Sequence, residues 1–406
     1  MEKKLQPVFG LAVIVAALGY FVDIYDLLLF SIIRIPSLQS LGLDSAAISR
    51  EGLRILNIQM IGLLLGGIFW GVLGDKKGRL KVLYASIILY SVGNIANGFV
   101  HTVNQYALVR FITGFGLAGE LGAGITLVSE LLSKEKRGIG TSLVAGIGLT
   151  GAVFAFVIKQ HFEWRTCYFI GGGLGFLLLL LRVGVLESGM FHGLRQTNVR
   201  RGNFWMLFTS RTRFKKYITA IFIGLPTWYV IGILISFSKE FAVKMDLQGS
   251  VDPGKAVMFA YAGISIGDVL IGFISQWLKS RKKAVALFYA LSIAGICWFF
   301  NLHGQPAASM YAACALLGFA TGFWAIFVTM SAEQFGTNIR ATVTTTVPNM
   351  VRGSLNLVSW LFLSLQASQG YLRSGWLTGI AVMIIGVLSL WFTEETFGKD
   401  LDYLEV

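Results

Sequence analysis

Twelve long apolar runs restrict the fold of this chain more than any other feature of its sequence. About 20 helical residues, rising about 1.5 Å each, cross a hydrocarbon core of about 30 Å. Every run reaches about that length, and helices satisfy their own backbone hydrogen bonds, as lipid requires of an open chain. We therefore predict an all-α membrane protein with twelve transmembrane helices, near residues 7–35, 53–74, 80–100, 104–130, 139–158, 164–186, 216–243, 254–278, 283–302, 307–332, 339–366 and 374–393.

Composition points the same way, because 55% of the residues are hydrophobic and only 14% are charged, against about 25% charged in soluble domains. The first run carries Asp23 and Asp26 and is followed by no small-residue cleavage site, which indicates a retained helix and not a signal peptide. Cys167, Cys297 and Cys314 fall in or beside predicted helices. We therefore expect neither a disulfide framework nor a metal site, and no cofactor.

The formal charge of +13 follows membrane topology and does not indicate nucleic-acid binding. With the N-terminus inside, the even-numbered loops and both termini hold 22 of the 34 Lys and Arg, and the odd-numbered loops hold 8. The other 4 lie in helices or at their ends: Arg34, Arg110, Arg182 and Arg352. This positive-inside bias predicts a multi-pass protein of the cytoplasmic (inner) membrane with both termini in the cytoplasm.

The chain also divides into two similar halves. The longest polar connection, residues 187–215, predicts a cytoplasmic linker between six-helix bundles at 1–186 and 216–406. Two segments recur at offsets of 201 and 203 residues: Gly71 to Asp75 as Gly272 to Gln276, and Glu130 to Arg137 as Glu333 to Arg340. Chance similarity of glycine-rich helices is the alternative explanation. A parallel repeat implies pseudo-symmetric bundles, alternating access and a binding site at the midplane between them.

The turn after the second run reads Gly71-x-Leu73-x-Asp75-Lys76-x-Gly78-Arg79-x-Lys81. It resembles the helix 2–3 loop signature of the major facilitator superfamily, except that the second basic residue falls at Lys81 and not at Leu80. In such a turn, an Asp at a helix end and clustered basic residues can form ion pairs that exist in only one conformation. The second copy has Gln276 in place of the acid, so we expect the charge relay in the N-terminal half. The gating residues implied are Asp75, Lys76, Gly78, Arg79, Glu130, Arg137, Asp268, Glu333 and Arg340.

Further segments narrow the branch of that family. The first run contains Asp23-Ile24-Tyr25-Asp26, which resembles the metabolite:proton symporters. The segment from Arg110 to Glu120 resembles those symporters and the sugar porters, and Glu395-Thr396-x-Gly398-Lys399 resembles the sugar-porter ending. The predicted seventh helix lacks the paired glutamines of sugar porters around Trp228. Gly151-Ala152 stands where drug:proton antiporters carry Gly-Pro.

Ionisable residues inside the predicted spans are functional candidates, since each costs about 2.5–3.5 kcal/mol to insert. Asp26 and Arg110 are expected about 12 Å and about 9 Å below the same surface, and so close together. In one interpretation they exchange the proton that is coupled to transport, with Asp23 as a second acid one turn away. In the other they form a static ion pair that locks helix 1 to helix 4.

The eleventh run carries a polar stripe at helical spacing, which predicts a face turned to water or substrate. It consists of Thr342, Thr345, Asn349, Arg352, Asn356 and Ser359. Arg352 is predicted near mid-membrane, where its planar fork matches a carboxylate, and Asn349 and Asn356 share its face. The alternative is a structural or gating salt bridge between Arg352 and Asp268.

Other polar and aromatic side chains complete the predicted site. Trp228, Tyr229 and Trp324 are predicted either to stack on an organic substrate or to pack helices, and Glu120 either to line the cavity or to satisfy a neighbouring helix. The four histidines fall in loops, so no histidine relay is expected.

These features predict a secondary transporter and not an enzyme, because no nucleophile or metal-ligand pattern is present. The predicted activity is proton-coupled symport of a small organic anion or zwitterion, such as a carboxylate metabolite, by rocker-switch alternating access. The alternatives are a sugar carrier, an exporter, and a non-transporting membrane sensor that would have lost its intramembrane acids. The expected partners are the solute, protons and the lipid bilayer, and a monomer is sufficient.

Overall fold

The computed structural model describes residues 10–133, 136–182 and 202–405, with Leu11, Ala12 and Arg137 described as backbone only. Throughout these ranges the regular structure is helical. The first half comprises α1 (Leu11–Ser40), α2 (Ser45–Lys77), α3 (Arg79–Asn97), α4 (Val103–Leu117), α5 (Glu120–Leu131), α6 (Arg137–Leu149), α7 (Gly151–His161) and α8 (Trp164–Leu181). The second half comprises α10 (Met206–Thr209), α11 (Arg211–Tyr229), the π-helical η2 (Val230–Ile235), α12 (Ser238–Lys244), α13 (Pro253–Trp277), α14 (Arg281–Phe300), α15 (Ala307–Ala320), α16 (Trp324–Glu333), α17 (Arg340–Gly353), α18 (Leu355–Gln369) and α19 (Tyr371–Phe392).

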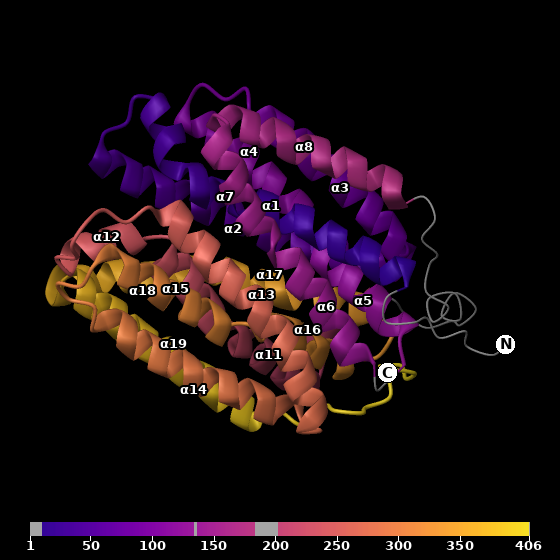
Figure 1. The fold of residues 1–406 in the computed structure, drawn as a ribbon. Coiled ribbons are helices and arrows are strands. Elements are labelled where there is room, and N and C mark those ends of the chain that lie inside the picture. The colour runs from indigo at the N-terminus through magenta and orange to yellow at the C-terminus, as the bar shows by residue number, and fades with distance from the viewer. Residues whose placement is uncertain (1–9, 134–135, 183–201, 406) are drawn as a thin grey trace.

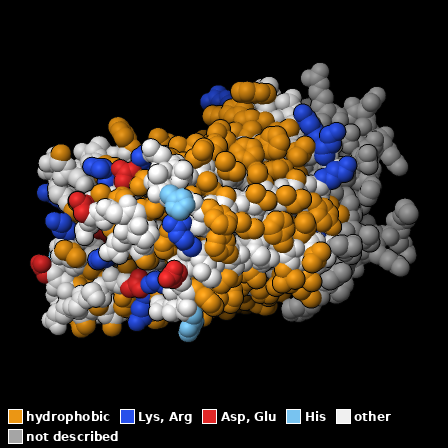
Figure 2. Space-filling model, turned by 90° about the horizontal axis from the view of Figure 1, so that it is seen from above, with side chains coloured by type: hydrophobic (Ala, Val, Ile, Leu, Met, Phe, Trp, Pro, Cys, Tyr) orange, Lys and Arg blue, Asp and Glu red, His pale blue; other side chains and the backbone are white. Residues whose placement is uncertain are grey.

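Ten helical spans in the described ranges are long and apolar enough to cross a membrane. They correspond to ten of the twelve predicted runs, and consecutive helices such as α4 and α5 form one span. The other two runs correspond to α3 and to the pair α17 and α18, in which polar side chains lower the hydropathy. Figure 2 shows a broad band of hydrophobic side chains across the molecule, with charged side chains gathered toward its ends. The all-α fold is therefore confirmed, and each of the twelve predicted runs corresponds to a helical segment.

Several predicted runs are broken helices, which apolarity alone does not reveal. Between α15 and α16, Gly322 packs so closely on α13 that an added Cβ would lie 2.7 Å from the Cα of Gly267. Between α4 and α5 the break falls at Ala118 and Gly119. Residues 187–201 of the predicted linker lie outside the described residues, and α11 begins at Arg211, within 187–215. The basic first turns of α11 extend this helix beyond the apolar run.

The helices run between two faces of the molecule. The terminal face carries the turn at Gly78, residues 334–339 and the C-terminal residues 401–405, and the opposite face carries residues 41–44, 245–252 and 301–306. Figure 1 shows α5 and α6 at the terminal face and α12 at the opposite face. The two faces are therefore separated by the full length of the helices.

The two halves lie side by side and pack through two helix pairs, α2 against α17 and α6 against α13 (Figure 1). Toward the terminal face, α5 and α17 also approach closely. A Cβ added at Gly122 would lie 2.4 Å from the Cα of Thr345, so only glycine fits there. The halves are thus closed at the terminal face in this conformation.

Candidate functional site

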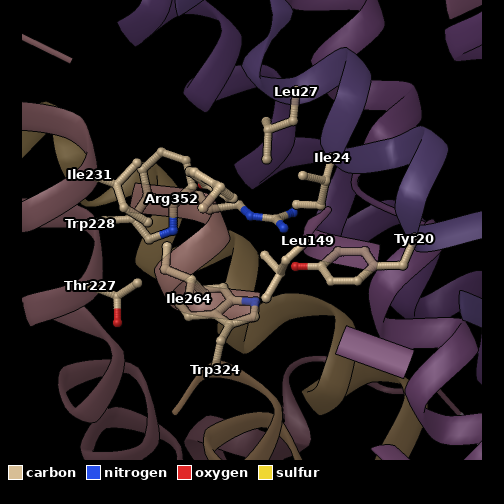
Figure 3. Close-up of a pocket in the computed structure, with 11 residues that line it drawn as sticks. Tyr20, Ile24, Leu27, Leu149, Thr227, Trp228, Ile231, Ile264, Trp324 and Arg352 are labelled. Carbon is tan, nitrogen blue, oxygen red and sulfur yellow. The ribbon is translucent and has the colours of Figure 1, made fainter. Parts of the chain in front are cut away.

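A narrow cavity lies between the two halves. Residues of α1 and α6 line it from the first half, and residues of α11, η2, α13, α16 and α17 line it from the second (Figure 3). The cavity volume is about 10 Å³, which is room for about one water molecule. Its lining consists of Tyr20, Ile24, Leu27, Leu149, Thr227, Trp228, Ile231, Tyr261, Ile264, Trp324 and Arg352. This is the position that an internal repeat favours for a substrate site.

Arg352 supplies the one formal charge among these lining residues. Its side chain is 1% exposed, and its guanidinium extends from α17 toward Ile24 of α1 in the other half (Figure 3). Nη1 donates a hydrogen bond to Oδ1 of Asn349 at 3.1 Å, whereas Nε has no partner in the described structure. Because a buried cation without an anionic partner is costly, an anion in the cavity would be held strongly.

Aromatic rings form much of the remaining wall. The Arg352 guanidinium lies 5.8 Å from the ring centroid of Trp324, and Trp228, Tyr20 and Tyr261 also line the cavity. Within the described residues, Nε1 of Trp324 makes no hydrogen bond. The cavity is too small for an organic solute in this conformation. Its cationic fork, flat apolar surfaces and unused donor would suit a planar organic anion once the halves move apart.

Asn349 lies behind Arg352 and joins the two halves. Its Nδ2 donates to the carbonyl oxygen of Ala118, at the α4–α5 break, at 2.9 Å, and to that of Thr345 at 2.8 Å. Its Oδ1 accepts from Arg352. Asn349 is outside the cavity lining and instead orients the guanidinium.

Three more predicted substrate residues also lie outside the lining. Asn356 of α18 is half-buried and donates to the carbonyl oxygen of Gly353 at 3.0 Å. The hydroxyl of Tyr229 donates to a carbonyl oxygen of α19 at 2.6 Å. Glu120 forms a buried ion pair with Arg182 at the end of α8. Glu120 therefore satisfies a neighbouring helix, which was one of its two predicted roles.

The predicted proton-coupling residues are neighbours, but their charged groups do not meet. Arg110 donates to the backbone oxygen of Asp26 at 2.9 Å and to Oε1 of Gln59 at 3.2 Å. Asp23 and Asp26 are fully buried, and none of their carboxylate oxygens accepts a hydrogen bond from the described residues. Asp23 lies within electrostatic reach of Arg352. Asp23 thus stands between the cavity and the buried charges of the first half.

Asp268 is not paired with Arg352. Its Oδ1 accepts the backbone N–H of Ala325 at 3.0 Å, in the first turn of α16. An anion at a helix N-terminus is stabilised by the unpaired N–H groups there. The alternative in which Asp268 neutralises Arg352 is therefore not realised in this conformation.

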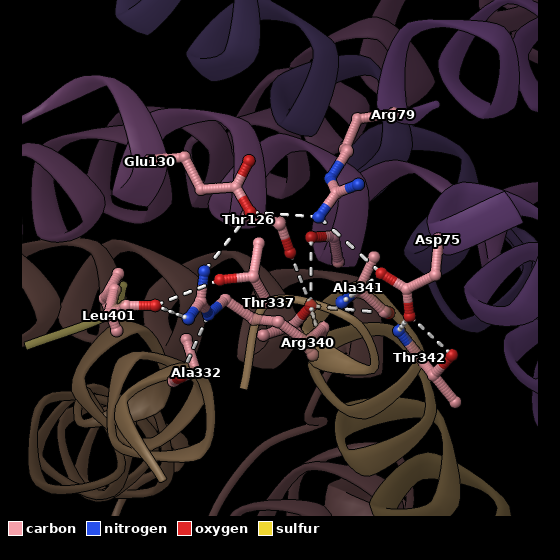
Figure 4. A network of polar contacts seen from close by, with 12 residues as sticks. Asp75, Arg79, Thr126, Glu130, Ala332, Thr337, Arg340, Ala341, Thr342 and Leu401 are labelled. Carbon is pink, nitrogen blue, oxygen red and sulfur yellow. Dashed lines mark hydrogen bonds and ion pairs between the residues drawn. The ribbon is translucent and has the colours of Figure 1, made fainter. Parts of the chain in front are cut away.

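The predicted gating residues form a buried polar network at the terminal face (Figure 4). Asp75 of α2 accepts hydrogen bonds from the backbone N–H groups of Ala341 and Thr342, at 3.1 and 2.8 Å, and from the Thr342 hydroxyl at 2.7 Å. Glu130 of α5 pairs with Arg79 at 2.9 Å and with Arg340 of α17 at 3.3 Å. The network therefore ties the two halves together at this face.

The remaining gating residues have other surroundings. Lys76 is exposed, and Gly78 has φ +106°, a conformation that favours glycine. The side chain of Arg137 lies outside the described residues. Glu333 pairs with Arg281 at 3.2 Å, which is the second-half counterpart of the Glu130 to Arg79 pair.

Several residues of these sites were not predicted as functional from the sequence. Tyr20 and Tyr261 line the cavity, and the spacing of Tyr20 from Asp23 on α1 would have indicated a shared face. Arg281 follows Arg79 by 202 residues, which matches the repeat. Arg182 gave no such signal, because its partner Glu120 is 62 residues away on another helix.

The two halves meet around a central charged cavity. At one face they are held together by a polar network that must break before that face can open. These features define a membrane transporter of the alternating-access type. The sequence model described as Major Facilitator Superfamily matches residues 9–359. The chain belongs to this family, and it is a transporter.

Known proteins resemble it along most of its length. It is 29% identical over 358 residues to the niacin transporter NiaP of Acinetobacter baylyi, covering 80% of each chain. It is 24% identical over 346 residues to the gentisate transporter of Corynebacterium glutamicum, covering 82% of this chain and 75% of that protein. Among solved structures, the proton:xylose symporter XylE matches with a TM-score of 0.76 at 16% identity, covering 97% of each chain.

Proposed function

We propose that this transporter carries a small aromatic carboxylate across the inner membrane by proton-coupled symport, as a monomer. The observation that carries the proposal is the cavity itself, in which the Arg352 guanidinium retains an unused nitrogen beside the ring of Trp324. Once the halves move apart and widen the cavity, a carboxylate on Arg352 would place its ring between the aromatic walls. Niacin and gentisate, named for two relatives, are carboxylates on aromatic rings.

The same cavity makes a sugar a poorer substrate. Sugar hydroxyls are recognised by side chains that both donate and accept hydrogen bonds, as amides do. The lining contains Thr227, Tyr20 and Tyr261 but no Asn or Gln among the described residues. The likeness to XylE concerns the fold alone. We therefore favour an organic acid over a sugar.

Proton coupling is assigned to Asp26, Arg110 and Asp23. Arg110 already contacts the Asp26 backbone, so a small shift of α1 against α4 would exchange that contact for the carboxylate. A carboxylate whose charged partner changes with conformation also changes its affinity for protons. Asp23 lies within electrostatic reach of Arg352. A substrate bound at Arg352 would therefore affect Asp26 and Arg110 through the charge of Asp23.

Orientation follows from the charge distribution. Among the described residues, the terminal face carries most of the Lys and Arg, so it is assigned to the cytoplasm together with both chain ends. Residues 1–186 and 216–406 are assigned to the two rocking bundles, although α11 begins at Arg211. In this conformation the cytoplasmic side is closed.

Uptake into proteoliposomes tests the substrate. Labelled nicotinate, benzoate, gentisate and xylose are compared with and without an inward proton gradient. We expect gradient-driven uptake of the carboxylates and not of xylose. Arg352→Gln abolishes this uptake, while Arg373→Gln, the matched change at an exposed arginine, leaves it intact. Xylose uptake with no carboxylate uptake would reject the proposal.

The coupling residues are tested in the same vesicles. We expect Asp26→Asn to abolish accumulation driven by the gradient while leaving benzoate counterflow intact, because exchange of solute needs no net proton movement. Gradient-driven accumulation that survives in Asp26→Asn would exclude Asp26 as the proton carrier.

A further inference from the structure

Two adjoining crevices lie at the opposite face, where the halves diverge. One has a volume of about 590 Å³ and lies between α2 and the helices η2, α18 and α19. The other, of about 330 Å³, is lined by α1, α2, α12 and the first residue of α19. Ser49, Glu240 and Tyr371 line both crevices. We call the two crevices together the vestibule.

The vestibule is strongly basic, although it lies on the face where positive charge is scarce. Its lining contains five cationic side chains and a single carboxylate, that of Glu240: the cations are Arg34, Arg50, Arg54, Lys239 and Lys244. Arg50 and Arg54 share Glu51 at the rim, at 3.2 and 2.8 Å. The excess of positive charge raises the local concentration of anions.

Arg34 is the centre of this charge. Its side chain is 4% exposed, and its guanidinium lies 4.5 Å from the ring centroid of Phe237. Nη2 pairs with Glu240 of the other half at 3.1 Å, while Nε and Nη1 have no partner among the described residues. Ser49 also donates to Glu240, at 3.1 Å. A buried guanidinium with two unused nitrogens beside an open crevice is a site for a carboxylate.

We propose that the vestibule is a second binding site for carboxylate anions, in which the carboxylate of an incoming solute replaces Glu240 on Arg34. The proposal rests on the proposed function in taking the transported organic acid as the ligand. Arg34 follows Leu27 of the central cavity by seven residues, or about 10 Å along α1. An anion bound here would break one of the ion pairs that join the halves, that of Arg34 with Glu240. Binding of the anion and opening of the path to the cavity would then be coupled.

Benzoate binding to the purified full chain tests the site, with Arg352→Gln present to remove the central site. We expect benzoate still to raise the melting temperature of this variant, and Arg34→Gln to abolish the shift. Glu240→Gln removes the internal competitor and should tighten benzoate binding about tenfold, the effect of about one charged hydrogen bond. Lys159→Met is the matched control, because Lys159 and Asp252 form an ion pair between the halves, at 3.1 Å, that lies outside the vestibule lining.

If Glu240→Gln and Lys159→Met change benzoate binding equally, Glu240 only holds the two halves together, and the proposal is wrong. The loss of all benzoate binding in Arg352→Gln would also overturn it. A second measurement avoids that variant: a cysteine at Gln39, which is exposed and lines the smaller crevice, is labelled with a charged thiosulfonate after Cys297→Ser. Benzoate should slow this labelling, and Arg34→Gln should remove the protection.

A third outcome would show that the vestibule binds a lipid and not the solute. If Arg34→Gln releases a co-purified acidic phospholipid and leaves benzoate protection at Gln39 unchanged, the vestibule is a lipid groove and the proposal is wrong. Failure of the vestibule leaves carboxylate uptake by the native protein intact, whereas failure of the proposed function is the absence of that uptake. The two failures are therefore distinguishable.

Discussion

We expect Asp75→Asn to shift the protein toward a conformation open at the terminal face. The Asp75 carboxylate accepts two backbone N–H groups and a hydroxyl from the first turn of α17, across the boundary between the halves. All three bonds must break when that face opens. Asparagine keeps one acceptor oxygen, but it loses the charge and turns an amide NH2 toward a backbone N–H.

The magnitude follows from these contacts. One hydrogen bond to a charged group contributes about 1.5–3 kcal/mol, and an anion at a helix N-terminus adds about 0.3–1 kcal/mol. The closed state therefore loses about 2–4 kcal/mol relative to the open state. At about 1.4 kcal/mol for each factor of ten, the closed-to-open ratio falls about 30-fold to about 700-fold.

Spin labels on cysteines at Lys77 and Lys279 measure this ratio, since both side chains are exposed at the terminal face, one on each half. Double electron–electron resonance should show a longer distance gaining population in Asp75→Asn. Lys81→Gln is the control, because the Lys81 side chain is exposed and Lys81 is not among the gating residues. An unchanged distance distribution in Asp75→Asn would refute the reasoning.

Three further predictions concern contacts elsewhere in the molecule. Arg182→Gln leaves Glu120 buried without its partner and should cost about 3–5 kcal/mol of stability. The melting temperature of Arg182→Gln should fall, and adding Glu120→Gln should raise it again. A double variant as unstable as Arg182→Gln would contradict this prediction. Gly122→Val should open the terminal face, because the valine side chain would clash with the α17 backbone. Spin labels at Lys77 and Lys279 would detect the opening, and a distance distribution unchanged from the native protein would argue against it. Burial alone would raise the pKa of Glu395, but hydrogen bonds from Ser280 and neighbouring backbone N–H groups outweigh it, so its pKa is lowered. The ionised Glu395 therefore stabilises the folded protein at pH values above the pKa of this group in the unfolded chain. That stabilisation is lost as the pH falls through the lower pKa of the folded protein. The native protein and Glu395→Gln should therefore differ in melting temperature at neutral pH and have similar melting temperatures in acid.

The sequence was most informative where membrane physics leaves few choices. Apolar run length predicted the helical spans, and the polar stripe of α17 predicted the position of Arg352, because lipid tolerates neither exposed backbone nor an exposed guanidinium. The repeat located Asp75 and Glu130 at one end of the molecule. Each of these inferences needs only local sequence and a known environment.

Pairings between distant helices were less predictable. Nothing local distinguishes a Glu120 that lines a cavity from one that pairs with Arg182, since the outcome depends on how α5 and α8 pack. Asp26 and Arg110 were placed at similar depth, yet depth does not fix rotation, and Arg110 meets the Asp26 backbone. Helix breaks such as that at Gly322 depend on close contact with another helix and leave hydropathy unchanged.

The bridging position of Asn349 implies that the two sides of the membrane are unequal for the solute. Its amide holds Arg352 with one end and the Ala118 carbonyl with the other. When the terminal face opens, the Ala118 contact is lost, and the guanidinium loses a fixed support. The conformation open at the terminal face should therefore hold a carboxylate less tightly than the closed one, so the solute is released more readily at that face than at the other.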